Sequence, residues 1–108
     1  MVRLTVTLHA PSARSVRDLL EALRFLGASV QLEPGCLTCS AWGESDWTVH
    51  YVEEWHTETD MRRRVRSDLF TSLLSVVESA EDPHVTFDFV TTTRGLDYVE
   101  EARRGSSR

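Results

Sequence analysis

One acidic residue stands in an otherwise aromatic row of the sequence. Glu53 has Tyr51 and Trp55 two positions away on either side, and alternate residues of an extended strand point to the same face of a sheet. A carboxylate among aromatic side chains loses solvation, which raises its pKa unless a cation pairs with it. Two interpretations follow: Glu53 accepts a proton in a cleft, or it forms an ion pair with a helical arginine such as Arg24 or Arg64.

The two cysteines form the sequence Cys36-Leu37-Thr38-Cys39. A redox-active C-x-x-C motif usually opens a helix, where the thiol pKa is lowered, but this one follows a Pro-Gly turn and opens a predicted strand. Side chains three positions apart on a strand point to opposite faces. A zinc site would also need two further ligands at suitable spacing. We therefore expect free, structural cysteines.

The four histidines, His9, His50, His56 and His84, do not show the spacing of a metal site. His50 and His56 would lie roughly 20 Å apart along a regular strand, too far for one ion. No H-x-x-x-H or two-His-plus-carboxylate spacing occurs. The sequence therefore predicts neither a protein-bound metal nor a cofactor.

Aromatic and basic residues supply the remaining candidates. Aromatic side chains concentrate in three predicted strands, at Trp42, Trp47, Tyr51, Trp55, Phe87 and Phe89. Most should be core, and the rest could line a slot for a planar ligand. The basic cluster Arg62-Arg63-Arg64 with Arg66 has acidic neighbours for helical ion pairs. One of these arginines could instead reach the cleft and meet an anionic substrate.

The elements that must position these residues follow from hydrophobic periodicity. Alternation predicts strands at 2–9, 36–42, 47–56 and 84–92, and helical spacing predicts a helix that is capped by Ser15 or Ser12 and stops at Gly27. A second helix begins after Thr57 and ends before 80–83, and 96–104 favours a short terminal helix. The order βαββαβ indicates an α+β, ferredoxin-like domain over 1–104, with two helices on one face of a four-stranded antiparallel sheet. Residues 105–108 should form a disordered tail.

Strand alternation also sorts the residues by face of the sheet. The helix-facing set is Val2, Leu4, Val6, Leu8, Leu37, Cys39, Ala41, Val49, Tyr51, Glu53, Trp55, Val85, Phe87 and Phe89. The opposite set is Arg3, Thr5, Thr7, His9, Thr38, Ser40, Trp42, Thr48, His50, Val52, Glu54, Thr86, Asp88 and Val90. The second face is too apolar to prefer bare water, so we expect a homodimer, although antiparallel sheets tolerate one solvated face. A bulge in the third strand would exchange Glu53 and Glu54.

Composition excludes several function classes. The chain has 108 residues, 41% of them hydrophobic, and a net charge of −5, which suits one globular domain and argues against binding to nucleic acid or an anionic membrane. It contains no Lys and no Asn, so no Lys Schiff base, P-loop Lys or catalytic Asn is possible. No apolar run reaches the ~20 residues of a membrane span. No signal-peptide pattern opens the chain, and a cytoplasmic location is expected.

Three segments resemble the antibiotic biosynthesis monooxygenase domain family over roughly residues 1–92: Pro34-Gly35-Cys36-Leu37, Val52-Glu53-Glu54-Trp55 and Arg66-Ser67-Asp68-Leu69-Phe70. The resemblance implies a ferredoxin-like protomer, a homodimer whose two sheets form an α/β barrel, and a cleft between each sheet and its helices. Family members include heme-degrading enzymes and quinone-forming monooxygenases that use neither metal nor flavin. Several members carry an Asn in the first strand, and many carry His where Arg64 stands here. The heme-degrading pattern of Asn, Trp and His is therefore not reproduced.

The resemblance and the residues together predict a cofactor-free monooxygenase that oxidises a small phenolic or quinol-like aromatic molecule with O2. Glu53 is the expected base, with His9 or His50 as alternatives, and Arg64 would stabilise the substrate oxyanion. The predicted substrate-binding aromatics are Trp55, Tyr51, Trp42 and Phe87. The alternatives are a non-catalytic module for ligand binding or dimerisation, and an isomerase of similar fold.

Overall fold

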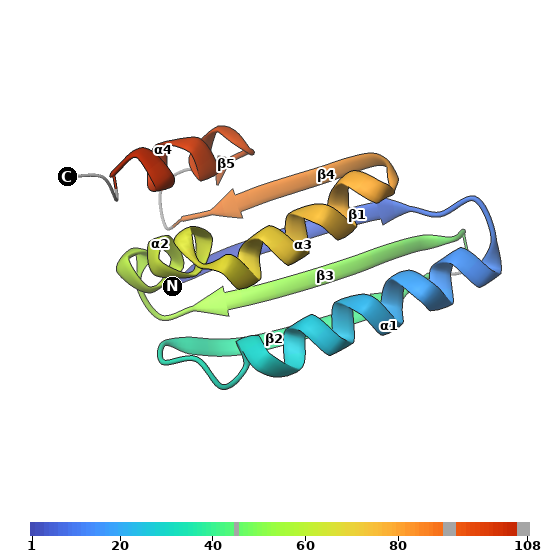
Figure 1. The fold of residues 1–108 in the computed structure, drawn as a ribbon, viewed down its shortest axis with the longest axis horizontal. Coiled ribbons are helices and arrows are strands. Elements are labelled where there is room, and N and C mark those ends of the chain that lie inside the picture. The colour runs from blue at the N-terminus through green and yellow to red at the C-terminus, as the bar shows by residue number, and fades with distance from the viewer. Residues whose placement is uncertain (45, 90–92, 106–108) are drawn as a thin grey trace.

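The computed structural model describes residues 1–44, 46–89 and 93–105. Its elements are β1 (Val2–His9), α1 (Ala13–Val30), β2 (Cys36–Gly43), β3 (Thr48–Trp55), α2 (Glu58–Arg66), α3 (Asp68–Ser79), β4 (Glu81–Asp88), β5 (Thr93–Arg94) and α4 (Asp97–Gly105). The antiparallel sheet has the order β2-β3-β1-β4-β5, and α1 and α3 lie across one of its faces (Figure 1). The predicted ferredoxin-like α+β fold is confirmed, with the two-residue β5 and the helix α4 added at the C-terminal end. No helix in the described ranges is long and apolar enough to cross a membrane.

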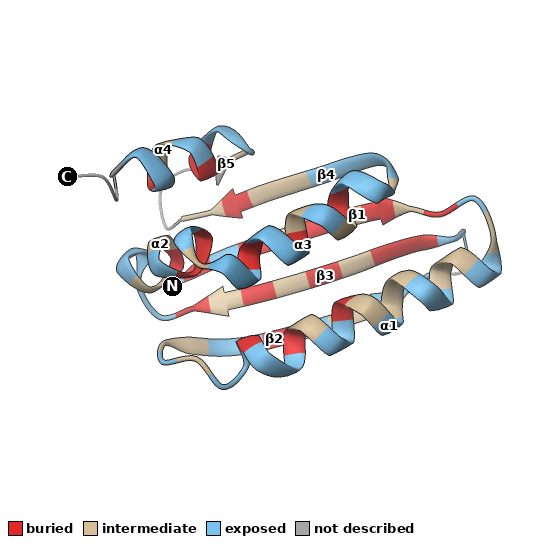
Figure 2. Ribbon diagram, viewed as in Figure 1, coloured by how far each residue is buried: buried red, intermediate tan, exposed pale blue. Residues whose placement is uncertain are grey.

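The core lies between the sheet and the helices, as the strand alternation predicts. Val2, Leu4, Val6 and Leu8 of β1 are all buried, and the residues between them are not. The same alternation of buried and intermediate positions is visible along β3 (Figure 2). Most of the predicted helix-facing set is buried or packed against the core. Leu37 is the exception, since 53% of its surface is exposed.

A β-bulge in β2 explains the position of Leu37. The pairing with β3 moves from Cys36 opposite Trp55 to Thr38 opposite Glu54, so β2 advances two residues while β3 advances one. Leu37 is the extra residue, and it leaves the pleat. Alternation predicts positions only in an unbroken strand, and the expected inward position of Leu37 is therefore wrong.

The first helix is longer than predicted. Ser12 is its N-cap and accepts a hydrogen bond from the Ser15 backbone N–H, which is one of the two caps expected. Gly27 does not stop the helix but lies inside it, where a Cβ would come within 2.9 Å of Cys39 Sγ. Glycine is needed here because α1 approaches the sheet closely.

The predicted second helix is divided into α2 and α3. Ser67, between them, has an extended backbone, and its Oγ donates a 2.6 Å hydrogen bond to the carbonyl of Arg64. A serine side chain that bonds the preceding turn competes with helix continuation. The break gives α2 a direction of its own, and its N-cap is Thr57, as predicted.

The fourth strand begins three residues earlier than expected and contains Pro83. The pairing with β1 shifts between Thr7, which faces His84, and His9, which faces Glu81, so β4 carries an extra residue there. Asp82 has a positive φ of 47° at this bulge. A bulge accommodates a proline, which has no N–H to donate to the ladder. The predicted end of this strand, with Val90, lies outside the described residues.

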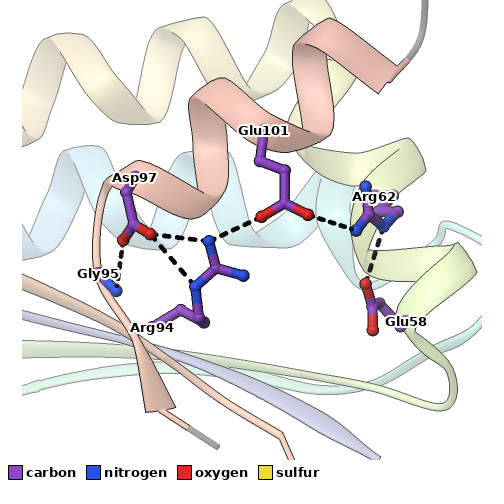
Figure 3. A network of polar contacts seen from close by, with 6 residues as sticks. All are labelled: Glu58, Arg62, Arg94, Gly95, Asp97 and Glu101. Atoms are coloured by element: carbon purple, nitrogen blue, oxygen red, sulfur yellow. Dashed lines mark hydrogen bonds and ion pairs between the residues drawn. The ribbon is translucent and has the colours of Figure 1, made fainter.

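The terminal helix is confirmed as α4, which lies against α2, and its residues Tyr98, Val99 and Ala102 are buried. Ion pairs at its surface join three elements (Figure 3): Glu101 meets both Arg62 and Arg94, Arg62 also meets Glu58, and Arg94 also meets Asp97. Arg103 of α4 donates to the carbonyl of Val65 in the last turn of α2. Gly105 closes α4, and the rest of the predicted tail lies outside the described residues.

Candidate active site

Glu53 lies two residues before the end of β3 and has no exposed surface. Its carboxylate accepts hydrogen bonds from the Tyr51 hydroxyl at 2.5 Å, from Trp55 Nε1 at 2.9 Å and from Arg64 Nη2 at 2.8 Å. Arg64 Nε is a further donor at 3.1 Å. The ion-pair interpretation is therefore confirmed for Arg64, while Arg24 donates to the carbonyl of Ala41 instead.

Arg64 reaches this carboxylate from the last turn of α2, just before the break at Ser67. Burial disfavours its charged guanidinium, but the hydrogen bonds and negative charge of Glu53 outweigh burial and raise the pKa of Arg64. The guanidinium also lies over the ring of Phe70, 5.1 Å from its centroid. Its Nη1 has no hydrogen-bond partner among the described residues. Arg64 thus remains a cation inside the core and keeps one donor free.

Tyr51 extends the buried network toward the first helix. Its hydroxyl donates to Glu53 and accepts a hydrogen bond from Cys39 Sγ at 3.3 Å. Burial, and next the charge of Glu53, raise the pKa of Tyr51 far above its usual range. Burial also raises the pKa of the Cys39 thiol to about 11. Both groups are therefore protonated at neutral pH, and they form a line of donors that ends on the Glu53 carboxylate.

A cavity of about 240 Å³ lies between α1 and the strands β2 and β3. It is lined by Leu23, Arg24, Gly27, Ala28, Gln31, Cys39, Ser40, Ala41 and Tyr51. An engineered apolar cavity of about 150 Å³ binds benzene, so this space suits a molecule of one or two rings. The Tyr51 side chain joins the cavity wall to buried Glu53.

A second cavity, of about 290 Å³, lies near the other end of α1. His9, Pro11, Ser15, Asp18, Leu19, Ser79, Ala80 and Glu81 line it. It includes none of the residues that contact Glu53, so we place the candidate active site at the cavity beside Tyr51.

The structure divides the predicted site residues between two faces of the sheet. The buried network consists of Glu53, Tyr51, Trp55 and Arg64. Trp55 has no exposed surface and donates a hydrogen bond to the carboxylate. Phe87, two strands away, packs on Tyr98 with ring centroids 4.7 Å apart. The helix-facing side therefore contains five of the predicted residues, four of them in direct contact.

The other three predicted site residues lie on the opposite face. The half-exposed Trp42 stacks on His50, with ring centroids 5.3 Å apart, and His50 also lies 3.1 Å from Glu44. His9 pairs with Thr48 at the end of the same face. The sheet therefore separates His9, His50 and Trp42 from the Glu53 network.

Sequence reasoning missed the α1 side of the cavity, which is formed by Leu23, Arg24, Gly27, Ala28 and Gln31. Gln31 follows the last turn of α1 and donates a 2.6 Å hydrogen bond to the carbonyl of Cys39. The available signal was Gly27, because a glycine on the apolar stripe of a helix also fits close approach to a sheet.

Comparison with known proteins agrees with this architecture. No family model matches the chain, and no curated protein sequence matches it. A candidate antibiotic biosynthesis monooxygenase from Deinococcus radiodurans superposes with a TM-score of 0.71 at 19% identity, over 85% of this chain and 94% of that one. A second antibiotic biosynthesis monooxygenase gives 0.66 at 17% identity, over 85% and 100% of the two chains. A protein from Shewanella oneidensis gives 0.70 at 15% identity, over 86% and 89%. At these identities the likeness shows a shared fold.

Proposed function

We propose that this chain is a cofactor-independent monooxygenase that oxidises a small phenol or quinol with O2 and works as a homodimer. The observation that supports it most is the position of Tyr51. This side chain lines a cavity of aromatic size and donates its hydroxyl proton toward a carboxylate that is closed to solvent. Its fold is also that of solved structures named as antibiotic biosynthesis monooxygenases.

Deprotonation of the substrate would pass through Tyr51. A substrate hydroxyl in the cavity gives its proton to Tyr51 Oη while Tyr51 passes its own proton to Glu53 Oε2, so the net change is a substrate anion and a neutral Glu53. Arg64 then has no anionic partner within the pair, and its positive charge stabilises the new oxyanion through the buried, poorly screened interior. Trp55 keeps the carboxylate oriented.

The electrons come from the substrate. The quinol anion, O2 and the proton held on Glu53 together give a hydroxyquinone and one water, and Glu53 returns to its carboxylate form. One oxygen atom enters the ring, the other leaves as water, and the four electrons taken up by O2 come from the aromatic molecule. The protein's contribution is proton transfer, orientation and exclusion of water. A cavity of about 240 Å³ favours one-ring and two-ring substrates over larger polycyclic ones.

Homodimer formation would cover the concave part of the open sheet face. Arg3, Thr5, Thr38, Ser40, Trp42, Val52 and Glu54 line this surface. The face combines the exposed Trp42 and the partly buried Val52 with threonines and the Arg3–Glu54 ion pair. An aromatic patch with a polar rim favours a protein partner over water. Sedimentation equilibrium should give twice the mass of the chain, and Trp42→Arg should shift the mass toward the monomer.

The activity test compares two buried tyrosines. Tyr51→Phe should lower oxygen uptake with an accepted hydroquinone by about 10²- to 10⁴-fold, the usual contribution of a positioned proton-transfer group. Tyr98→Phe removes a hydroxyl that has no partner among the described residues, so it should leave turnover unchanged. Uptake is measured with an oxygen electrode in the presence of EDTA, on a panel of one-ring and two-ring quinols.

The same measurements separate the alternatives. If no quinol supports oxygen uptake and one of them binds tightly, the chain would be a ligand-binding module and not an enzyme. Product formation without oxygen consumption would indicate an isomerase. Equal activity of the two tyrosine variants would remove Tyr51 from the proton path.

A further inference from the structure

Two neighbouring strands bring together three potential metal ligands on the side of the molecule away from the Glu53 network. His9 ends β1, and Asp82 and His84 lie near the start of β4. One ligand atom from each of the three lies within 4.8 Å of the others. The sequence showed no such group because spacing along one strand does not reveal residues that meet across strands.

The bulge in β4 forms this cluster. Thr7 faces His84 and His9 faces Glu81, so the extra residue of β4 is accommodated beside His9. Asp82 occupies the bulge with φ of 47°, a conformation that few residues other than Gly, Asn and Asp adopt readily. The two imidazoles pack edge to face, with centroids 6.2 Å apart and planes at 89°. The two rings are therefore nearly perpendicular and do not stack.

One of the three distances between ligand atoms is close to that of a coordination sphere, and the other two pairs of ligand atoms lie within 4.8 Å. His84 Nε2 lies 3.6 Å from Asp82 Oδ2. Ligands bound at about 2.1 Å from one ion in tetrahedral or octahedral geometry lie roughly 3.0–3.4 Å apart. The side chains of His84 and Asp82 are 63% and 80% exposed, so a rotamer adjustment can close the remaining gap without disturbing the core.

The surroundings of His9 suit a ligand as well. Its Nδ1 lies 3.4 Å from Thr48 Oγ1, and a proton on Nδ1 would leave the Nε2 lone pair free for a metal. Asp46 is close enough to interact electrostatically with His9, and Glu81 is its partner across the strands. The negative charge around the cluster favours a cation.

We propose that His9, Asp82 and His84 form a binding site for one divalent first-row transition metal ion, of the zinc, cobalt or nickel type. Two imidazoles and one carboxylate suit these ions, whereas Mg²⁺ and Ca²⁺ prefer oxygen ligands alone. Three ligands from the chain leave open coordination positions for water or a small anion. The site lies apart from the Tyr51 cavity and is independent of the proposed oxidation.

The test is calorimetric titration of the untagged, reduced chain with Zn²⁺, and with Mg²⁺ as the control ion. Zn²⁺ should bind with one ion per chain, and Mg²⁺ should give no heat. Loss of an outer-shell partner costs about 10- to 100-fold in metal affinity, so His9→Ala, His84→Ala and Asp82→Asn should each cost at least as much. His56→Ala, which changes an exposed histidine elsewhere, should bind as the unaltered chain does.

Cobalt distinguishes this site from the cysteines. Co²⁺ at a site of two imidazoles and a carboxylate gives d–d absorption without a thiolate charge-transfer band, and His84→Ala should abolish it. A thiolate band, one ion per two chains, absence of Zn²⁺ binding, or a His56→Ala loss equal to that of His84→Ala would each overturn the proposal. The exposed His84 and Asp82 can be changed without loss of the fold, which circular dichroism checks.

Discussion

Two arginines of α2, two residues apart, form ion pairs of the same length in opposite environments. Arg64 Nη2 and Arg62 Nε both lie 2.8 Å from a glutamate oxygen, but Arg64 and Glu53 have no exposed side-chain surface, whereas Arg62 and Glu58 are partly exposed. Water screens the exposed pair and would solvate either partner alone. The buried pair has no such substitute, so loss of one partner leaves an uncompensated charge.

The two ion pairs belong to networks with different roles: the buried network forms the candidate site, and the exposed network lies at the surface. The Glu53 carboxylate combines one cation with the neutral donors Tyr51 and Trp55, and burial makes each contact depend on the others. The network of Arg62, Arg94 and Glu101 in Figure 3 lies at the surface and joins α4 to the body of the molecule. We therefore expect large effects of substitution in the first network and small ones in the second.

The largest effect is expected for Arg64→Met. Removal of one partner of a buried ion pair costs about 3–5 kcal/mol of unfolding free energy, and Glu53 would lose two of its donor atoms as well. Arg62→Met, two residues away on the same helix, is the matched control and should lower the unfolding free energy far less. Urea unfolding of both variants checks the comparison, and similar losses would contradict it.

A smaller effect is expected for the buried tyrosines. Tyr51→Phe removes a hydrogen bond to a charged group, which contributes about 1.5–3 kcal/mol. Tyr98→Phe should leave the unfolding free energy nearly unchanged, because no described residue bonds the Tyr98 hydroxyl. Urea midpoints of the two variants measure the difference. A Tyr98→Phe loss as large as that of Tyr51→Phe would show that burial alone, without the partner, sets the cost.

The smallest effect is expected for Glu101→Gln. This change removes the shared acceptor of Arg62 and Arg94 at the surface. The melting temperature should fall slightly at low ionic strength and match that of the unaltered chain in about 1 M salt, where the screening length is near 3 Å. If the melting temperature of the variant stays lower at high salt, the surface network would contribute to stability in the way expected of the buried network.

Much of the architecture could be predicted from the alternation of residues along the strands, and so could the burial of the charged Glu53. Alternation alone placed Glu53 with Tyr51 and Trp55 on the helix-facing side. The expectation of a helical arginine as its partner, such as Arg24 or Arg64, came from the cost of burying a carboxylate. Parity also placed His9, His50 and Trp42 on the other face, so their separation from Glu53 was implicit in the sequence. The sequence pattern could not show that the carboxylate already has four donor atoms.

The errors lie where the backbone departs from regular geometry. Leu37 and the start of β4 were misplaced because a bulge adds a residue without changing the composition of the strand. The break at Ser67 was missed because the apolar stripe continues across it and a single serine is tolerated within helices. Gly27 was interpreted as a helix stop, since the sequence does not show the proximity of Cys39.

Because the helix is interrupted at Ser67, the short helix α2, which carries the buried Arg64, depends on α4 for support. A helix of nine residues, such as α2, is marginal by itself, and here the carbonyl of Val65 is held by Arg103 while Tyr98 lies beneath Arg62. Residues after β5, far from Glu53 along the chain, thus help fix the angle from which Arg64 enters the protein interior. If the chain is shortened before α4, the sheet should still form. Arg64, however, should no longer be held against Glu53.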